Sequence, residues 1–280
     1  MSKLDRLGWV ACDWFEIEGQ RFGVRSTSEA FATWVRRVLD PYRVDGPVDP
    51  DDDPLYGLVV EDETSRSGRV GRRLNVLYLG TWDIVRTTDP GTVARSFLLD
   101  VQRLAFAHRD DAVYLDGAVV SSNGTTVLVP QSIVPTLSRA GRRVQRALDA
   151  MLPGTMAVAV DPETGRLIPV PSLPDVPDDA SDAFRTDGPR VDPRAWVDEA
   201  LSVDRVLLYG SEPELVPVSR AETLAGLSSA VRNLDVMRGR AIRALGRLVE
   251  GSRPYRVRFT GTAHMIEILS SLVNGAGPGS

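Results

Sequence analysis

Residues 127–141, VLVPQSIVPTLSRAG, follow the order that a nucleotide-binding loop requires. An apolar run predicts a strand, a short turn follows, and the spacing of leucine and arginine then predicts a helix. In such a loop, glycines let backbone N–H groups point at phosphate oxygens, and a lysine reaches the β- and γ-phosphates. The chemistry to test here is therefore the binding or transfer of a phosphoryl group.

The residues at these positions do not match the signature of a phosphate-binding loop. Its pattern is glycine, four residues, glycine, lysine, and serine or threonine, and the matching positions are Gln131, Thr136, Leu137 and Ser138. Without glycine the backbone conformations of the loop are disfavoured, and Pro135 also removes an N–H donor. Leu137 puts a hydrocarbon where the phosphates need a cation. We therefore expect no catalytic residue and no bound nucleotide or other cofactor, although Ser138 is retained.

The elements around this loop predict an α/β protein with two parts. Periodicity and turn residues predict a small N-terminal α/β unit over 1–108, a core with a mixed sheet and C-terminal helices over 109–274, and a disordered tail over 275–280. Ser26 and Glu29 have the spacing of a capping box at the start of the first helix. In the N-terminal unit, we expect strands near 14–17, 21–24, 56–60 and 74–79, and helices near 27–39 and 91–107.

The core is predicted to be rich in strands before it becomes helical. Asn123-Gly124 is a strong hairpin turn between two of the strands. We expect strands near 112–115, 117–121, 125–129, 156–160, 166–170, 203–209, 215–218 and 255–259. We expect helices near 136–151, 219–250 with a break near Gly239, and 262–273.

Composition excludes several classes of protein. The chain has 280 residues, a net charge of −5 and one cysteine, Cys12. A negative net charge argues against general nucleic-acid binding, and a single cysteine excludes an internal disulfide or a cysteine-rich zinc site. No run approaches the roughly 18 apolar residues of a membrane span, and the N-terminus lacks the apolar region of a signal peptide. We therefore expect a cytoplasmic protein that does not bind membranes.

Other residues with chemical potential favour structural roles. His108 and His264 are the only histidines, and neither lies near a nucleophile-elbow pattern. His108 is expected to cap the end of a helix. The acidic runs at 51–53 and 110–111 lack the calcium-loop pattern and are expected to be solvated, and no metal site is predicted. Cys12 lies beside Asp13 with no adjacent cation in the sequence to lower the pKa of its thiol.

Residues 114–140, YLDGAVVSSNGTTVLVPQSIVPTLSRA, resemble the core of the HPr kinase family and its HPr-kinase-related members. In that family a strand ending in His-Gly-Ala leads through a hairpin into the phosphate loop. Segments 15–26, 158–174 and 204–233 are also similar in the same order, so the resemblance spans roughly 14–273. It implies a P-loop-type kinase core with a degenerate site. Asp116 stands at the family's histidine, and Gly154-Thr155-Met156 stands where relatives have an acidic pair.

The resemblance also implies a function. HPr-kinase-related proteins occur in bacterial clusters for ribosomally made, post-translationally modified peptides (RiPPs), and those with eroded loops look like recognition proteins. The closest analogue is the recognition protein of daptide biosynthesis. We therefore expect a pseudokinase-like scaffold that binds a precursor's leader peptide and presents it to RiPP-modifying enzymes. The alternatives are a divergent ATP-dependent kinase acting on a peptide or small molecule, a structural subunit, and an unrelated α/β protein.

Two groups of arginines are candidates for contact with a partner. One follows the loop and comprises Arg139, Arg142, Arg143 and Arg146. The other lies along the predicted C-terminal helix and comprises Arg232, Arg238, Arg240, Arg243 and Arg247. A solvated helix face is the simpler interpretation, and a patch for an acidic peptide is the alternative. The sequence leaves the oligomeric state open, including a homo-oligomer.

Overall fold

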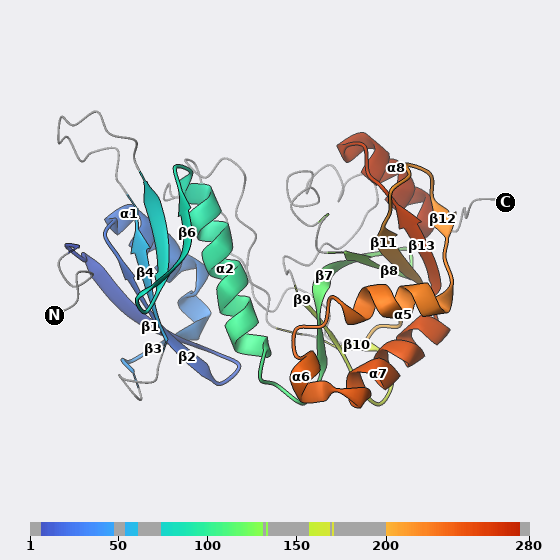
Figure 1. Ribbon diagram of the computed structural model, residues 1–280, viewed down its shortest axis with the longest axis horizontal. Helices are drawn as coiled ribbons and strands as arrows, with labels where there is room; N and C mark the ends of the chain where they lie inside the picture. The colour runs from blue at the N-terminus through green and yellow to red at the C-terminus, as the bar shows by residue number, and fades with distance from the viewer. Residues whose placement is uncertain are drawn as a thin grey trace. The chain divides into compact units, whose positions relative to one another are not determined.

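The computed structural model describes residues 7–47, 54–60, 74–130, 133, 157–168, 170 and 200–274. Within these residues the chain is an α/β protein with two mixed β-sheets (Figure 1), which confirms the predicted fold class. The described residues divide into two units, the first ending at Ala105 and the second beginning at Phe106. Each unit has its own sheet and its own core.

The first unit is built on a six-stranded sheet of order β3-β1-β2-β4-β5-β6. Its strands are β1 (Ala11–Ile17), β2 (Gln20–Ser26), β3 (Arg43–Val44), β4 (Leu55–Val59), β5 (Asn75–Leu79) and β6 (Trp82–Thr87). Its helices are α1 (Glu29–Val38) and α2 (Pro90–Phe106), with a 3-10 turn, η2 (Asp40–Tyr42). Only β2 and β4 pair in parallel, because α1 connects them.

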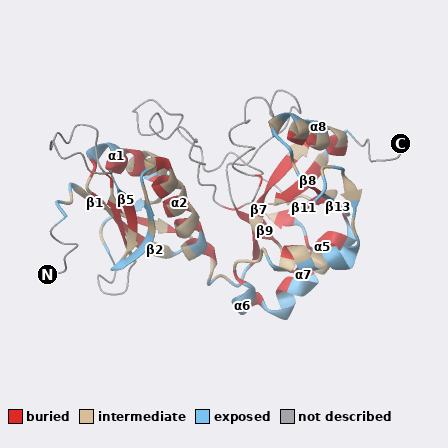
Figure 2. Cartoon of the chain, turned by 45° about the horizontal axis from the view of Figure 1, so that its top comes forward, coloured by how far each residue is buried: buried red, intermediate tan, exposed pale blue. Residues whose placement is uncertain are grey.

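A chain of aromatic rings runs across one face of the first sheet and reaches α2. Phe15 of β1 stacks on Phe22 of β2 with ring centroids 5.8 Å apart, and Phe22 meets Tyr56 of β4 at 5.9 Å. Tyr56 in turn packs edge-on against Phe97 of α2 at 5.3 Å. Since alternate strand residues point to opposite faces, these rings form the inner face, with α1 and α2 on that side (Figure 2).

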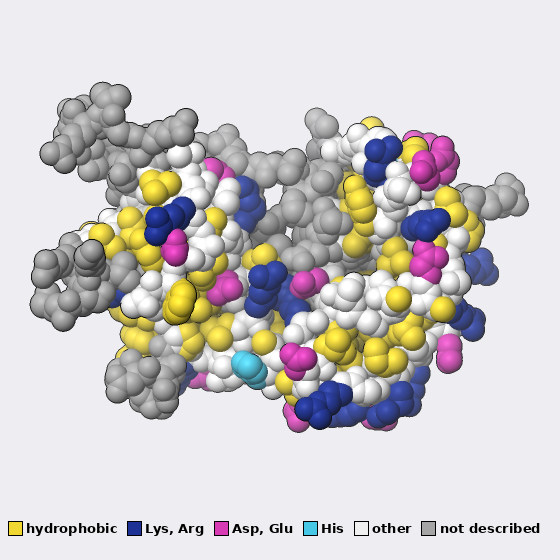
Figure 3. Space-filling view, in the orientation of Figure 1, with side chains coloured by type: hydrophobic (Ala, Val, Ile, Leu, Met, Phe, Trp, Pro, Cys, Tyr) yellow, Lys and Arg dark blue, Asp and Glu magenta, His cyan; other side chains and the backbone are white. Residues whose placement is uncertain are grey.

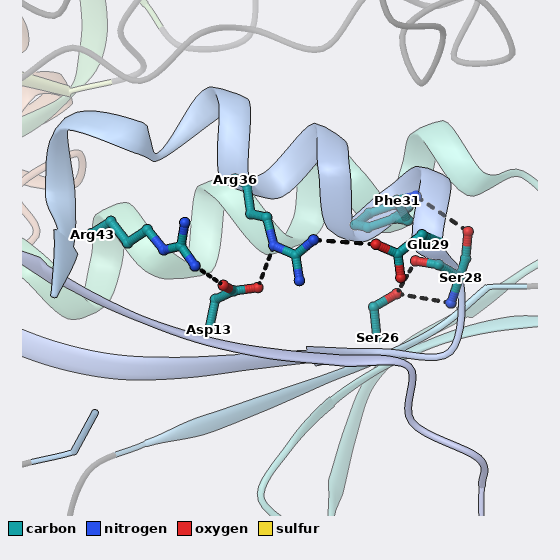
Figure 4. Close-up of polar contacts among 7 residues, drawn as sticks. All are labelled: Asp13, Ser26, Ser28, Glu29, Phe31, Arg36 and Arg43. Carbon is teal, nitrogen blue, oxygen red and sulfur yellow. Dashed lines mark hydrogen bonds and ion pairs between the residues drawn. The ribbon is translucent and has the colours of Figure 1, made fainter. Parts of the chain in front are cut away.

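A carboxylate also joins α1 to the inner face of the sheet (Figure 4). Asp13 of β1 accepts hydrogen bonds from Nε of Arg36 on α1 and from Nη2 of Arg43 on β3, both at 2.8 Å. The Asp13 side chain is 8% exposed. Burying an unpaired carboxylate costs free energy, and the two arginines offset this cost by supplying hydrogen bonds and positive charge.

The N-terminal cap of α1 is Ser28, so the prediction of Ser26 was wrong. The Ser28 hydroxyl accepts a hydrogen bond from the backbone N–H of Phe31 at 3.2 Å. Ser26 is the last residue of β2, and its backbone belongs to the sheet. Its hydroxyl accepts the N–H of Ser28, which fixes the turn between strand and helix (Figure 4). Strand β2 therefore ends at Ser26, two residues beyond the end of the strand predicted near 21–24.

Strand β6 was not predicted from the sequence. It follows β5 through a tight turn at Gly80-Thr81 and pairs with it in antiparallel fashion, with a bulge between Leu77 and Tyr78. Its side chains are mostly exposed, so it lacks the apolar alternation on which strand prediction depends. Asp89 then accepts hydrogen bonds from the N–H groups of Gly91 and Thr92, which confirms that the Asp-Pro-Gly sequence opens the helix.

The second unit contains a seven-stranded sheet of order β10-β9-β7-β8-β11-β13-β12. Its strands are β7 (Val113–Ser122), β8 (Thr125–Pro130), β9 (Ala157–Val160), β10 (Leu167–Ile168), β11 (Arg205–Tyr209), β12 (Val216–Pro217) and β13 (Arg253–Val257). The neighbours β8, β11 and β13 run in parallel, while the other pairs are antiparallel. Residues predicted as two strands at 112–115 and 117–121 therefore form one continuous strand, β7.

Helices cover both faces of the second sheet (Figure 1). They are α5 (Arg220–Ser228), α6 (Leu234–Met237), α7 (Gly239–Glu250) and α8 (Thr262–Val273). On one face α8 packs into a buried cluster that includes Val127, Val129, Leu207 and Leu269. On the other face Gly226 of α5 lies against Leu208 of β11, and α7 packs on α5. The helix predicted over 219–250 is thus three helices, broken at 229–233 and at Arg238.

Candidate functional site

The candidate loop begins where β8 leaves the second sheet. Gln131, Thr136, Leu137, Ser138 and the four arginines of 139–146 lie outside the described residues. Within the loop the structure describes Ile133, which is 3% exposed and belongs to the core cluster beneath α8. The loop therefore contributes an apolar side chain to the core close to the end of β8.

Strand β8 ends at Pro130 because another segment occupies its continuation beside β7. Pro130 pairs with Gly117. The residues of β7 that precede Gly117, at 114–116, are instead bonded to the segment 230–232. Asp116 donates its N–H to the carbonyl of Ala230, and Tyr114 accepts the N–H of Arg232, both at 2.8 Å. Strand β8 therefore ends where the segment 230–232 begins to pair with β7.

Asp116, which stands at the histidine position of the resembled family, forms an ion pair with Arg232. Nε of Arg232 donates to Oδ1 of Asp116. The Arg232 side chain is 4% exposed and that of Asp116 is 25% exposed. The guanidinium compensates the charge of the carboxylate and occupies one of its oxygens.

Asn233 fixes the segment that carries Arg232. Its Oδ1 accepts the N–H of Tyr114 at 3.1 Å, and its Nδ2 donates to the carbonyls of Arg109 at 2.8 Å and Ala112 at 2.7 Å. The residue is 1% exposed. Three hydrogen bonds in a buried position hold 230–233 against the start of β7, and thereby position the guanidinium beside Asp116.

Sequence patterns offered little sign that Arg232 and Asn233 are held against β7. Leu227 and Leu234 are seven residues apart, which matches helical periodicity and concealed the break between α5 and α6. The one available signal was the pair Arg232-Asn233 itself, since asparagine favours turns and caps over helix interiors. Arg232 was predicted to belong to an exposed arginine face, and this was wrong because its side chain is buried.

The other C-terminal arginines, Arg238, Arg240, Arg243 and Arg247, are exposed. Figure 3 shows lysine and arginine side chains gathered along the lower edge of the part that carries α6 and α7. Arg240, Arg243 and Arg247 share one side of α7, at spacings of three and four residues. Arg240 donates to the carbonyl of Asp110 at 3.2 Å, and Arg247 donates to that of Pro162 at 2.6 Å. These bonds tie α7 to two loops, so at least two of the arginines have a structural role.

The remaining candidates lack the environment of a reactive group. Partial burial and the neighbouring Asp13 raise the pKa of the Cys12 thiol, and Arg25 offsets only part of this, so the reactive thiolate is disfavoured. Hydrogen bonds from Arg109 lower the pKa of Asp111, which is thereby held as a carboxylate. His264 accepts the N–H of Thr260 at 3.3 Å, next to the start of α8.

No helix among the described residues is long and apolar enough to cross a membrane. In the same part of the chain, no three histidine, cysteine, aspartate or glutamate side chains are grouped as metal ligands. The fold and the site define an α/β protein with two mixed sheets. No family model matches the chain, and no curated protein is significantly similar to it.

Proposed function

We propose that this protein is a non-catalytic recognition and scaffold protein for a ribosomally made peptide. In this proposal it retains a degenerate HPr-kinase-like core, binds the leader segment of a precursor peptide in the cytoplasm and presents the peptide to RiPP-modifying enzymes. It uses no nucleotide and no metal. The resemblance supplies the biosynthetic context, and the state of the former phosphate site supplies the physical argument.

The observation that carries the proposal is the ion pair between Asp116 and Arg232 at the end of β8. Catalysis of phosphoryl transfer depends on cations that neutralise the phosphates and on groups that orient the nucleophile. Here the sequence has Leu137 at the lysine position, and the buried guanidinium beside the loop is engaged by a carboxylate.

A divergent ATP-dependent kinase is the second candidate, and the sheet topology favours it. Since β8, β11 and β13 are parallel neighbours, their carboxyl ends lie at one edge of the sheet, and the candidate loop follows β8 there. Open α/β sheets bind nucleotides at such edges. This candidate predicts that ATP binds with magnesium, which the recognition proposal denies.

Two titrations separate the candidates. The purified chain is titrated with ATP and magnesium by calorimetry. It is also titrated with the candidate precursor, the peptide of a short open reading frame sought beside its gene. We expect no measurable heat from ATP and saturable binding of both the precursor and its isolated leader. A precursor without its leader is the matched control and should not bind. Micromolar ATP binding, or the lack of any leader dependence, would overturn the recognition proposal.

A further inference from the structure

The two sheets end in four edge strands of unequal length. Within the described residues, β3, β10 and β12 each have two residues, whereas β6 has six. An edge strand presents unpaired N–H and C=O groups that can pair with another extended chain. Edges of two residues offer a partner almost no ladder, so β6 is the edge on which a further strand can be built.

Two apolar side chains of β6 are exposed. Trp82 is 80% exposed, more than any other large apolar side chain among the described residues. Ile84 is 39% exposed. Exposed apolar surface of this kind marks interaction sites more often than isolated small side chains do. Tryptophan is also the residue type most enriched among the energetic centres of protein interfaces.

The strand also lacks most of the devices that protect sheet edges. Natural edges are blunted by proline, lysine or uncompensated charge. The sequence of β6 is WDIVRT, in which Asp83 and Arg86 form an ion pair with each other, so the edge is neutral. The protecting device present is the bulge opposite Leu77 and Tyr78, and on either side of it the pairing with β5 is regular.

We propose that an extended peptide segment binds the first unit by adding as a strand to the open edge of β6, with Trp82 as its apolar anchor. This inference rests on the proposed function and names the binding site within it. Backbone hydrogen bonds would supply affinity, and side chains at alternate positions would supply specificity. The peptide that fits has an apolar residue near Trp82 and no proline where the ladder needs an N–H.

A second copy of this chain fits the edge less well than a peptide. If two β6 strands paired antiparallel with full overlap, Trp82 of each would meet the polar end, Arg86 and Thr87, of the other. The exposed indole would then gain little apolar contact. A peptide can place an apolar side chain against the indole and still complete the ladder, so its chemistry matches both features of the edge.

The test uses the synthetic leader of the neighbouring precursor, labelled with fluorescein, and measures its anisotropy with the full chain. Trp82→Ala should weaken binding about tenfold or more, the loss typical of an anchor residue. Tyr209→Ala is the matched control, since Tyr209 is 62% exposed on the second unit, and it should leave the affinity unchanged. Circular dichroism checks that both variants are folded.

A second experiment changes only the peptide. Leaders N-methylated at even or at odd positions lose alternate hydrogen-bond donors. Strand addition predicts that one series abolishes binding and the other retains most of it, since only alternate N–H groups of a strand face its neighbour. Equal losses in both series, or unchanged binding to Trp82→Ala, would overturn the inference while leaving leader binding intact.

Other outcomes have distinct meanings. If the wild-type chain binds no leader, the proposed function itself fails. If sedimentation finds a dimer that Trp82→Ala dissociates, a second copy occupies the edge and the inference is overturned. A monomer with period-two sensitivity to N-methylation is the result expected from a peptide added at β6.

Discussion

Asp13 of the first unit and Asp116 of the second are both strand carboxylates paired with arginine from elsewhere in the chain. The partners of Asp13 remain partly in solvent, with Arg36 33% and Arg43 53% exposed, whereas Arg232 is 4% exposed. Exposed guanidinium groups retain water, but a buried one depends on its protein partners. The arginines of the first unit can therefore be solvated without Asp13, whereas Arg232 depends on Asp116 for its compensating charge.

The difference also concerns what each pair connects. Asp13 joins strand β1 to the next helix and to β3, which are close in the chain. Asp116 is joined to a residue 116 positions away, and the segment around Arg232 takes the place of a longer β8. The ion pairs of Asp13 therefore join elements that are close in the chain. The ion pair of Asp116 joins two distant segments next to the end of β8.

If this contrast is correct, the cost of removing a polar side chain should follow its burial. The largest effect is expected at Asn233, which is 1% exposed. Asn233→Ala leaves the N–H of Tyr114 and two carbonyls without partners, and we expect a loss of about 3 kcal/mol in the free energy of unfolding. Urea denaturation measures it.

Asn274→Ala is the control, because this exposed asparagine only accepts a bond from the exposed Asn123. Its effect should stay within about 0.5 kcal/mol. If the two asparagine variants are equally stable, the segment 230–233 is not held as described.

The second effect concerns the buried guanidinium itself. Arg232→Met leaves the Asp116 carboxylate without its counter-charge, and we expect a loss of about 2 kcal/mol, since Asp116 is still partly solvated. Adding Asp116→Asn should restore part of that loss, because the uncompensated charge is gone. Both variants should remain unable to bind ATP.

Arg256→Met is the matched control for this pair. Arg256 and Glu222 are each 46% exposed, so their ion pair should contribute less than about 0.5 kcal/mol. A double variant that is no more stable than Arg232→Met alone would contradict the proposed pairing, and ATP binding gained by either variant would favour the kinase.

Sequence patterns were sufficient for the elements with a regular apolar stripe. The hairpin of β1 and β2, helix α2 behind Asp89, and helix α8 were predicted near their observed positions. In each, local spacing decides which side chains face the core. The class of the fold followed from their order.

Long-range contacts explain what the sequence could not predict. Asp116 and Arg232 are brought together by strand pairing, and nothing in their local sequence specifies the partner. Strand β6 was missed because an edge strand with exposed side chains has no buried face to produce alternation. The absence of a phosphate-loop signature at 131–138 can be read from the sequence, since that motif is local, but the pairing of Asp116 with Arg232 cannot.

The third effect tests the ion pairs of Asp13 in the first unit. Asp13→Asn removes the charge that holds Arg36 and Arg43, and we expect a loss of about 1.5 kcal/mol, less than at the second site because both arginines regain water. The matched control is Glu16→Gln on the opposite face of β1, because the carboxylate of Glu16, paired with Arg21, is 38% exposed. Equal losses in urea denaturation would show that burial of the carboxylate does not matter here.

The smallest effect is expected at an exposed carboxylate, Asp89, whose side chain is 45% exposed. Burial alone would raise the pKa of Asp89, but hydrogen bonds from Thr92 and Gly91, with the charge of Arg95, lower it overall. Asp89→Ala removes these acceptors at the start of α2, and the loss should be about 1 kcal/mol at pH 7.

The pH dependence of that difference follows from the direction of the shift. Because the folded pKa of Asp89 lies below the unfolded value, its contribution is complete above about pH 4 and declines as pH falls through the folded pKa. Unfolding free energies of the wild type and Asp89→Ala should therefore converge as the pH falls below the folded pKa of Asp89. If the difference in unfolding free energy stays constant or grows on acidification, the charged carboxylate does not stabilise the start of α2. In that case the exposure of the carboxylate does not explain how this site differs from that of Asp116.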